Sequence, residues 1–278
     1  MRRISSRQNP VVGRFRELAR GARAGRVLLD GEHLVDEALA AGVPLEIVAL
    51  ADRLVEARRN ADESRTDSGR DARSDGLIAR IQRTDAELLR VPDAVMAAIS
   101  PVKQPSGIVA IAQAGAATLE DALARTPQLV PVLAGVQDAG NVGAIIRAAE
   151  GCGATGAVAI EGTADPFGWK ALRGAMGSTL RLPIATRQPL ATTIVELQRR
   201  GVTVAAAVPR EGAPLPRCDL RGPMAILLGG EGAGLDASTV AAATLHITIP
   251  MRAPVESFNV AITAALILYE AARQRAEI

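Results

Sequence analysis

The pattern of apolar and polar positions divides the chain into two segments, each of which predicts strands and helices in alternation. In the first segment, apolar runs at 26–31 and 45–50 predict strands. The stretch 32–42, whose apolar positions follow a helical period up to Gly42, predicts a helix. The same alternation resumes at residues 76–81, 84–91 and 107–113. A small α/β unit is therefore predicted.

The second segment gives a stronger signal because its predicted strands are almost entirely apolar. They lie at residues 129–136, 156–160, 202–208, 224–229 and 245–249. Helices are predicted at about 141–151, 167–176, 190–200, 236–243 and 257–273. Short connections and apolar strands favour a parallel sheet with helices on both faces. Such sheets bind ligands beyond the carboxyl ends of their strands, so candidate chemistry lies in the loops after Val136, Leu228 and Ile249.

Length and composition agree with two globular parts. A chain of 278 residues with 48% apolar side chains can form two cores. The predicted domains are residues 1–112 and 129–278, with a linker at 113–128. Residues 60–76 are charged, rich in Ser and Gly, and almost free of large apolar groups. Their composition predicts a mobile insertion in the first domain.

Positive charge is concentrated at the start of the chain. The net charge is +2, but residues 1–27 hold eight arginines against one acid, Glu17, so this part carries +7 and the remainder −5. A basic arm is typical of proteins that bind a polyanion, because neutralised phosphates release counterions. The alternative is that these residues only solvate a helix face. The candidate RNA contacts are Arg2, Arg3, Arg7 and Arg14.

Other features of the composition exclude several classes of protein. Five aromatic residues are too few for stacking platforms that bind single-stranded bases. Two cysteines without metal-ligand spacing predict no metal site and no disulfide framework. The chain has no apolar run of 18 residues, and residues 1–5 do not open a signal peptide, which favours a cytoplasmic protein that spans no membrane.

The first candidate loop places polar residues at the start of a predicted helix. Asn141 lies where the helix is expected to begin, Gly143 follows in its first turn, and Arg147 is one turn further on. Asn141 is expected near the face that carries the other two. Backbone N–H groups at a helix N-terminus favour an anion, and Arg147 could add a bidentate contact to a phosphate. The alternative is a capping asparagine and a solvated arginine.

The second loop, residues 229–234, holds four glycines around one carboxylate, Glu231. Glycines let the backbone approach a ligand closely, although a tight turn into the next helix would also explain them. In the third loop, Ser257 and Asn259 are expected in the first turn of a helix that begins near Glu256, beside its positive dipole end. One of them could cap the helix, but the pair indicates a ligand site.

Together the three loops resemble the motifs of the SpoU (TrmH-like) family of RNA ribose 2′-O-methyltransferases, within the SPOUT superfamily. The stretches NVGAIIRAAEGCGA, LLGGEGAGL and IPMRAPVESFNVAITAALILYE look like its first, second and third motifs. This resemblance spans residues 129–273. The stretches NPVVGRFRELA, LLDGEHLVDEAL and KQPSGIVAIA are similar to the RNA-binding domain, itself similar to ribosomal proteins, that precedes many members.

The resemblance implies a deep trefoil knot in the C-terminal part of the parallel sheet, which patterning alone would not predict. The knot would form a cleft for S-adenosylmethionine, and the family acts as a homodimer that completes the cleft across its interface. The positions carried over as lining the cleft are Leu228, Gly229, Gly230, Ile249, Met251 and Phe258.

The resemblance also implies a catalytic set, namely Asn141, Arg147, Glu231, Ser257 and Asn259. An unassisted guanidinium is a poor base, since its pKa stays above ~12. We therefore expect Arg147 to bind a phosphate and stabilise developing alkoxide charge. Asn141 is expected to hold the hydroxyl group or Arg147, and Glu231 to accept a hydrogen bond from one of these two.

A separate N-terminal domain favours large-subunit (23S) ribosomal RNA as substrate, with tRNA as the alternative. Four positions depart from the family pattern: Gly230 lacks a side-chain amide, Phe258 enlarges a residue expected near the adenine, Ala261 lacks a hydroxyl and Ala175 replaces a serine. They leave a non-catalytic RNA-binding homologue as one alternative, with altered cofactor affinity as a milder consequence. A dinucleotide-binding enzyme is disfavoured, because the sequence lacks the glycine fingerprint of that class.

Overall fold

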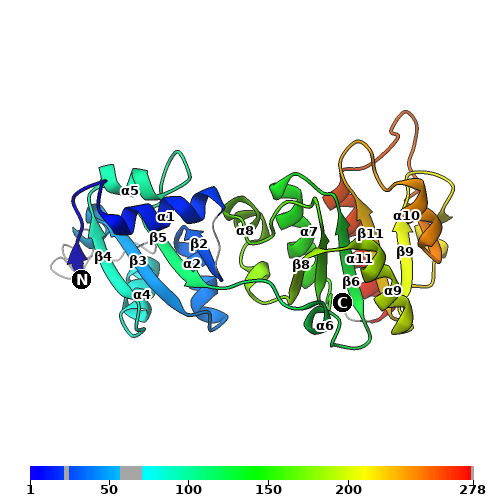
Figure 1. The fold of residues 1–278 in the computed structure, drawn as a ribbon, viewed down its shortest axis with the longest axis horizontal. Coiled ribbons are helices and arrows are strands. Elements are labelled where there is room, and N and C mark those ends of the chain that lie inside the picture. Colours follow the sequence, from blue (N-terminus) through cyan, green and yellow to red (C-terminus); the bar gives the residue numbers. More distant parts are fainter. Residues whose placement is uncertain (22–24, 57–70, 277–278) are drawn as a thin grey trace. The chain divides into compact units, whose positions relative to one another are not determined.

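The structure is a computed structural model that describes residues 1–21, 25–56 and 71–276. The chain divides into two compact units, each containing one sheet flanked by helices (Figure 1). We call them the N-terminal unit and the C-terminal unit, and they comprise residues 1–115 with 167–169 and residues 116–166 with 170–278, respectively.

The N-terminal unit contains a five-stranded sheet in the order β1–β4–β3–β5–β2. Strands β1, β4 and β3 are parallel, whereas β5 is antiparallel to both of its neighbours. The strands predicted at 26–31 and 45–50 are confirmed as β2 and β3. The strand bounds are β1 Arg2–Arg3, β2 Arg26–Asp30, β3 Leu45–Ala51, β4 Glu87–Val91 and β5 Ile108–Gln113.

Two pairs of helices cover this sheet. On one face, α1 and α5 bury side chains such as Phe15 and Met96 among those of the strands. On the other face, α2 packs against α4 and against β2 and β5. The helix bounds are α1 Pro10–Arg20, α2 Glu32–Ala40, α4 Asp71–Ile81 and α5 Asp93–Ile99.

Helix α1 is part of the body of the unit and not a separate basic arm. Its Val12, Phe15 and Leu18 are buried, and β1 pairs in parallel with β4. Because an amphipathic helix buries one face, its arginines necessarily gather on the other. The predicted arm was therefore wrong, although the concentration of arginines on this surface remains.

The predicted insertion at 60–76 is only partly within the described residues. Residues 60–70 lie outside them, but 71–76 form the first half of α4. Leu77, Ile78 and Ile81 are buried further along this helix. Burial of these three side chains stabilises the whole helix, including its polar first turns at 71–76. Composition alone had assigned those turns to the insertion.

The C-terminal unit contains a seven-stranded sheet in the order β10–β12–β9–β11–β6–β7–β8, and every pairing is parallel. The five predicted strands and the parallel sheet are confirmed. Two edge strands, β8 and β10, were missed because β8 is half polar and β10 has only two residues. The bounds are β6 Leu129–Ala134, β7 Ala157–Ile160, β8 Ile184–Gln188, β9 Thr203–Ala207, β10 Ala213–Pro214, β11 Met224–Gly229 and β12 Leu245–Thr248.

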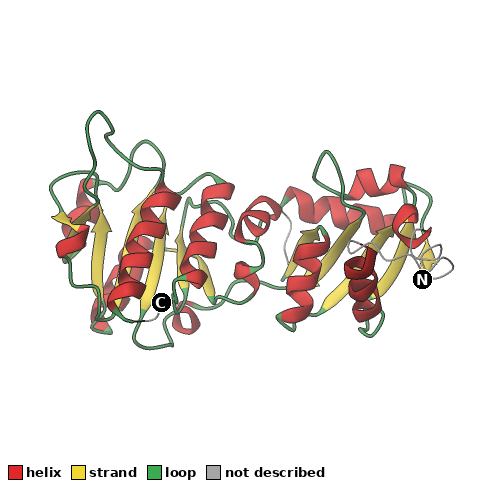
Figure 2. Ribbon diagram, turned by 180° about the vertical axis from the view of Figure 1, so that it is seen from behind, coloured by secondary structure: helices red, strands yellow, loops and turns green. Residues whose placement is uncertain are grey.

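Helices cover both faces of this sheet. Side chains of one parity along β6 and β11 form a core with Ile194 and Leu197 of α9. The opposite parity faces α7 and α11, which lie beside each other against the strands (Figure 2). Among the described helices, none is both long and apolar enough to cross a membrane. The bounds are α6 Leu119–Ala122, α7 Ala139–Gly151, α8 Trp169–Ala175, α9 Leu190–Arg199, α10 Ala237–Ala242 and α11 Val260–Gln274.

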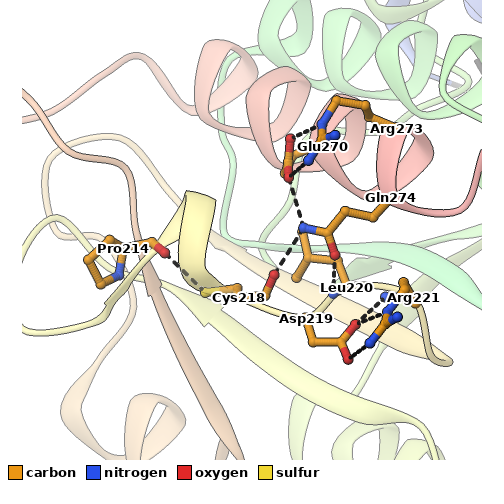
Figure 3. A network of polar contacts seen from close by, with 8 residues as sticks. All are labelled: Pro214, Cys218, Asp219, Leu220, Arg221, Glu270, Arg273 and Gln274. Atoms are coloured by element: carbon orange, nitrogen blue, oxygen red, sulfur yellow. Dashed lines mark hydrogen bonds and ion pairs between the residues drawn. The ribbon is translucent and has the colours of Figure 1, made fainter.

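A polar network fixes the last turns of α11 to the connection between β10 and β11 (Figure 3). Gln274 Nε2 donates to the carbonyl oxygen of Cys218 at 2.9 Å and to Glu270 Oε1 at 2.8 Å. The backbone N–H of Leu220 donates to Gln274 Oε1 at 2.8 Å. Arg273 forms an ion pair with Glu270 at 2.7 Å. The helix that carries the third motif is thus held at its far end.

Candidate active site

Polar side chains from the three predicted loops form one hydrogen-bonded chain beyond the strands of the C-terminal unit. Asn141 Nδ2 donates to Glu231 Oε1 at 2.7 Å, and Asn259 Nδ2 donates to Asn141 Oδ1 at 3.1 Å. Asn259 Oδ1 in turn accepts from the backbone N–H of Ala261 at 2.9 Å. Three of the five predicted catalytic residues therefore lie in direct contact, although they are distant in sequence.

The ends of this chain determine the orientation of both amides. An ionised carboxylate only accepts hydrogen bonds, so Asn141 must turn its NH₂ group toward Glu231 and its oxygen toward Asn259. At the other end, two backbone N–H groups of α11 require the oxygen of Asn259, which leaves its NH₂ group for Asn141. Neither amide can rotate without losing a hydrogen bond, so the three loops are held in one arrangement.

The carboxylate of Glu231 is bound by backbone N–H groups of the two residues that precede α7, Gln137 and Asp138. The helix begins at Ala139 and is capped by Asp138, whose Oδ1 accepts from the backbone N–H of Asn141 at 2.8 Å. Glu231 Oε2 accepts from the backbone N–H of Gln137 at 3.1 Å. Asn141 was expected to begin the helix, and the N–H groups there were expected to favour an anion. The expected start was wrong, because Asp138 caps the helix three residues earlier, whereas an anion at this helix stays a prediction.

The pKa of Glu231 reflects this environment. Burial by itself raises the pKa, but hydrogen bonds from Asn141 and from the backbone N–H groups of Gln137 and Asp138 outweigh it. The pKa of the carboxyl group therefore lies below its usual range, and Glu231 is ionised at neutral pH. Neutral donors alone produce this stabilisation, so no cation of the described residues pairs with this negative charge.

Gly143 has a packing role that the sequence analysis did not anticipate. A Cβ atom at this position would lie 2.3 Å from the carbonyl oxygen of Ala171 and 2.9 Å from the backbone nitrogen of Ala175. Any side chain would push α7 away from α8. The glycine is therefore required for close contact between two helices and not for access of a phosphate.

The third loop also differs from the prediction. Helix α11 begins at Val260, so Ser257 lies outside it and Asn259 is its N-cap residue. The expected start near Glu256 was wrong, because Asn259 captures the first free N–H groups of the helix with its side-chain oxygen. Asn259 thus caps α11 and at the same time takes part in the hydrogen-bonded chain of side chains.

A cavity of about 770 Å³ lies beside the polar chain. The carboxyl ends of β9, β11 and β12 and the first turn of α11 enclose it, which is where the parallel sheet predicts a ligand. All six residues expected to line a cleft do line this one, namely Leu228, Gly229, Gly230, Ile249, Met251 and Phe258. Three of the expected catalytic residues line it as well: Glu231, Ser257 and Asn259.

One wall of this cavity was not predicted from the sequence. The segment 207–210 after β9 lines it, as do Leu235, Val240 and Thr263. The rule that ligands bind at the carboxyl ends of parallel strands applies equally to β9 and could have indicated this segment. Thr263 could have been found from its position one turn after Asn259 on the same helix face.

Two glycines bring the second loop back against the end of β11. A Cβ atom at Gly229 would lie 2.4 Å from the carbonyl carbon of Gly234, and one at Gly230 would lie 2.2 Å from the carbonyl oxygen of Gly135. The backbone N–H of Gly234 donates to the carbonyl oxygen of Gly230 at 3.1 Å. The missing side chains thus permit a compact loop that presents backbone groups to the cavity.

The segment that forms this cavity and polar chain, residues 128–269, matches the SpoU rRNA Methylase family, and residues 14–110 match the MRM3-like substrate binding domain. The chain belongs to the SpoU rRNA methylase family. The resemblance noted from its three motifs is therefore confirmed over both parts of the chain.

Individual SpoU relatives match almost the whole chain. The chain is 31% identical over 273 residues to the 23S rRNA (guanosine(2553)-2′-O)-methyltransferase RlmP of Bacillus subtilis (strain 168), with 97% of this chain and 98% of the relative covered. It is 31% identical to the 23S rRNA (guanosine-2′-O-)-methyltransferase RlmB of Ralstonia nicotianae, with 83% and 94% covered. An AdoMet-bound rRNA methyltransferase from Sinorhizobium meliloti superimposes with a TM-score of 0.80 at 26% identity, over 98% of this chain and 97% of that chain.

Two departures from the SpoU pattern, at Gly230 and Ala261, do not remove a group from the cavity. Gly230 contributes backbone to its lining, and its missing side chain would meet Gly135. Ala261 is not among the lining residues, whereas Thr263, two positions further along the helix, places a hydroxyl-bearing side chain there. These positions therefore do not favour a scaffold without catalytic function.

Arg147 is the one predicted catalytic residue that lies apart from the others. It is exposed on α7, does not line the cavity, and makes no hydrogen bond or ion pair with the described residues. Six residues after Asn141, it lies about 120° around the helix from that side chain. The expected shared face of Asn141 and Arg147 was therefore wrong, and of these two side chains Asn141 is the one that hydrogen-bonds to Glu231.

In the N-terminal unit, most of the arginines predicted to bind RNA already have partners. Arg7 Nε donates to the carbonyl oxygen of Ala94 at 2.9 Å and forms no ion pair with a carboxylate in the described part of the chain. The other three face acids of the same unit: Arg2 with Glu87 at 3.0 Å, Arg3 with Asp52 at 3.5 Å and Arg14 with Glu46 at 3.0 Å.

Proposed function

We propose that this chain is an S-adenosylmethionine-dependent ribose 2′-O-methyltransferase that acts on 23S ribosomal RNA in the cytoplasm. The observation that carries the proposal is the meeting of Asn141, Glu231 and Asn259 beside a cavity lined by positions of the same three motifs. The relatives in Bacillus and Ralstonia, which match over most of their length, are named for this reaction. A guanosine is accordingly the first nucleotide to test.

The cavity fits S-adenosylmethionine. Its volume of about 770 Å³ is that of a site for a ligand of this size. Leu228, Ile249, Met251 and Phe258 offer apolar contact to an adenine ring, and the side-chain-free backbone at Gly229 can approach its edge. When bound, S-adenosylmethionine supplies a methyl group activated by a positively charged sulfur.

Methyl transfer needs an attacking oxygen in line with the methyl group, so positioning is the main task of the residues. Asn141 and Asn259 each keep one amide N–H that no hydrogen bond in the described chain uses. We assign these N–H groups, together with the hydroxyl of Ser257, to orienting the ribose. Glu231 keeps Asn141 in the required rotamer, and the proton leaves through a substrate phosphate or water.

Arg147 binds a phosphate of the RNA and stabilises the negative charge that develops on the attacking oxygen. Arg147 does not line the cavity of its own protomer. We therefore assign it to an active site that two protomers of a homodimer form together at their interface. Helix α11, which packs beside α7, presents the surface for that interface. Its exposed apolar side chains recur at helical spacing, and together with Phe258, two positions before the helix, they are Ile262, Leu266 and Tyr269.

Two further assignments complete the proposal. The connections after β11 and β12 form the trefoil knot of the family, and their residues line the cavity. The N-terminal unit is the RNA-binding domain, and it recognises structured RNA by shape and phosphates, because aromatic side chains for stacking are few. Arg7, whose charge faces no carboxylate, is the first of its four candidate contacts, ahead of Arg2, Arg3 and Arg14.

The test is transfer of labelled methyl from S-adenosylmethionine to unmodified ribosomal RNA and to tRNA, followed by alkaline hydrolysis. A 2′-O-methyl group blocks cleavage of the adjacent phosphodiester, so label in resistant dinucleotides from 23S RNA alone is the expected result. Label from tRNA alone would replace the substrate. Label in mononucleotides would mean base methylation and overturn the geometry. No label and no cofactor binding would favour a non-catalytic RNA-binding protein.

A further inference from the structure

A pair of opposite charges lines the cavity from two loops that no motif of the family connects. Arg210 lies in the connection after β9 and Glu256 in the connection between β12 and α11. Arg210 Nη2 is 3.3 Å from Glu256 Oε1. Both residues line the cavity, and their side chains are 72% and 80% exposed, respectively.

Stability of the fold does not account for this pair. Ion pairs this exposed contribute little to the free energy of unfolding, because water screens both charges. The single contact also leaves most of the hydrogen-bonding capacity of both groups unused. The other guanidinium N–H groups of Arg210 and the second carboxylate oxygen of Glu256 bond to nothing else in the described chain.

The remaining charges of the cavity are already engaged. Glu231, the other carboxylate in the lining, accepts from the side chain of Asn141 and from the backbone N–H of Gln137, just before α7. Among the described residues that line the cavity, Arg210 is the single cation and Glu256 the only carboxylate without such bonds. The cavity thus offers one positive and one negative group next to each other, on a side reached from solvent.

We propose that Arg210 and Glu256 form the subsite for the α-amino acid end of S-adenosylmethionine, with Arg210 binding its carboxylate and Glu256 its ammonium group. This inference rests on the proposed function. The ligand carries these two opposite charges on one carbon atom, a spacing that matches adjacent protein charges. Binding replaces one exposed ion pair by two charge-assisted hydrogen-bonded contacts, of which the guanidinium–carboxylate contact can be bidentate.

The experiment measures calorimetric affinities of the full-length protein for three ligands. S-adenosylmethionine and S-adenosylhomocysteine carry the amino acid end, whereas 5′-methylthioadenosine lacks it. Arg210→Met and Glu256→Gln should each weaken binding of the first two by about tenfold and leave methylthioadenosine within about twofold. Arg221→Met is the matched control: it removes an exposed ion pair with Asp219 that lies outside the cavity, and should change none of the affinities.

The double variant Arg210→Glu/Glu256→Arg separates a ligand subsite from a simple latch between the loops. It keeps an ion pair but exchanges the positions of the two charges. If the pair only holds the two loops together, the exchanged charges hold them equally well. Wild-type affinity for S-adenosylmethionine in this variant would therefore overturn the proposal. Continued weak binding is the expected result.

Other outcomes are equally decisive. Equal weakening of all three ligands in the single variants would mean that the pair only shapes the loops, and unchanged affinities would remove the subsite while leaving the proposed function intact. If the wild-type protein bound none of the three ligands, the proposed function itself would fail.

Discussion

The two units contain carboxylates that are ionised for different reasons. In the N-terminal unit, the hydrogen bond from Arg26 to Glu46, with the nearby charge of Arg14, outweighs burial and lowers the pKa of that carboxyl group. In the C-terminal unit, burial of Glu231 is outweighed by neutral donors, an amide and backbone N–H groups. Charge in the first unit is therefore neutralised locally, whereas the site keeps a net negative group and a separate, unpaired Arg147.

A count of arginines therefore does not locate the positive charge that is available to a ligand. Many arginines of the N-terminal unit pair with acids brought close by the fold, such as Arg90 with Asp52. Polar residues that converge from loops distant in sequence indicate a functional site better than a count of arginines does. Neighbouring residues in the sequence do not explain why these side chains meet. The substitutions below test this distinction.

The largest effect is expected from Arg147→Ala. Loss of a group that stabilises charge in the transition state lowers turnover by about 10²–10³-fold. Affinity for S-adenosylmethionine and the melting temperature should stay unchanged, because the side chain is exposed and lies outside the cavity. Arg147→Lys should recover only part of the activity, because an ammonium group lacks the bidentate fork. Single-turnover methylation of 23S RNA measures this, and near-normal turnover of Arg147→Ala would show that this unpaired charge has no role.

Glu231→Gln should lower turnover by about 10–10²-fold, because an amide at this place can donate as well as accept and no longer fixes the rotamer of Asn141. Since the pKa of Glu231 lies below its usual range, the carboxylate is ionised from about pH 6 to about pH 9. The loss should therefore be constant over that interval. Asp219→Asn, an exposed acid elsewhere in the unit, is the control. A loss that disappears at one end of the interval would mean that Glu231 itself titrates during catalysis.

Much of the C-terminal unit could be predicted because its strands are apolar and its site follows from the carboxyl-end rule. What could not be predicted depends on hydrogen bonds between distant segments. Periodicity placed Asn259 inside a helix, but the structure uses its oxygen to begin that helix. Likewise, nothing in the local sequence indicates that Glu231 binds the backbone just before α7, because the two segments meet only in the folded chain.

The same limit applies to charge. The arginines of the first 27 residues are evident in the sequence, but their acids come from β3, β4 and the residues after β3, which pairing of strands brings near. Arg210 shows the converse: a single arginine in an unremarkable loop lines the cavity because β9 ends beside β11. Local patterns give elements and motifs, whereas partners depend on topology.

A smaller effect is expected from Glu270→Gln in the network that holds α11. Hydrogen bonds from Arg273 and then Gln274 lower the pKa of Glu270 to about 2, from 4.5 in the unfolded chain. A lowered pKa stabilises the fold above the unfolded value, and that contribution is lost as pH falls through the folded value. The variant should thus be less stable by about 0.5–1 kcal/mol at neutral pH, with the difference shrinking between about pH 4.5 and about pH 2. Urea unfolding at several pH values measures it, and a difference independent of pH would exclude the ionic contribution.

The smallest effect concerns the arginines of the N-terminal unit. Arg7→Ala should weaken binding of 23S RNA by a few fold and lower the salt dependence by about one counterion, because its charge faces only a carbonyl oxygen. Arg14→Ala should change affinity by less than about twofold, since its guanidinium already faces Glu46. Filter binding across a range of salt concentrations compares the two variants. Equal losses would mean that Arg14 exchanges its carboxylate for a phosphate on the RNA. Ion pairing within the protein would then not predict which arginines are available to RNA. The two units would differ in their folds but not in the availability of their charges.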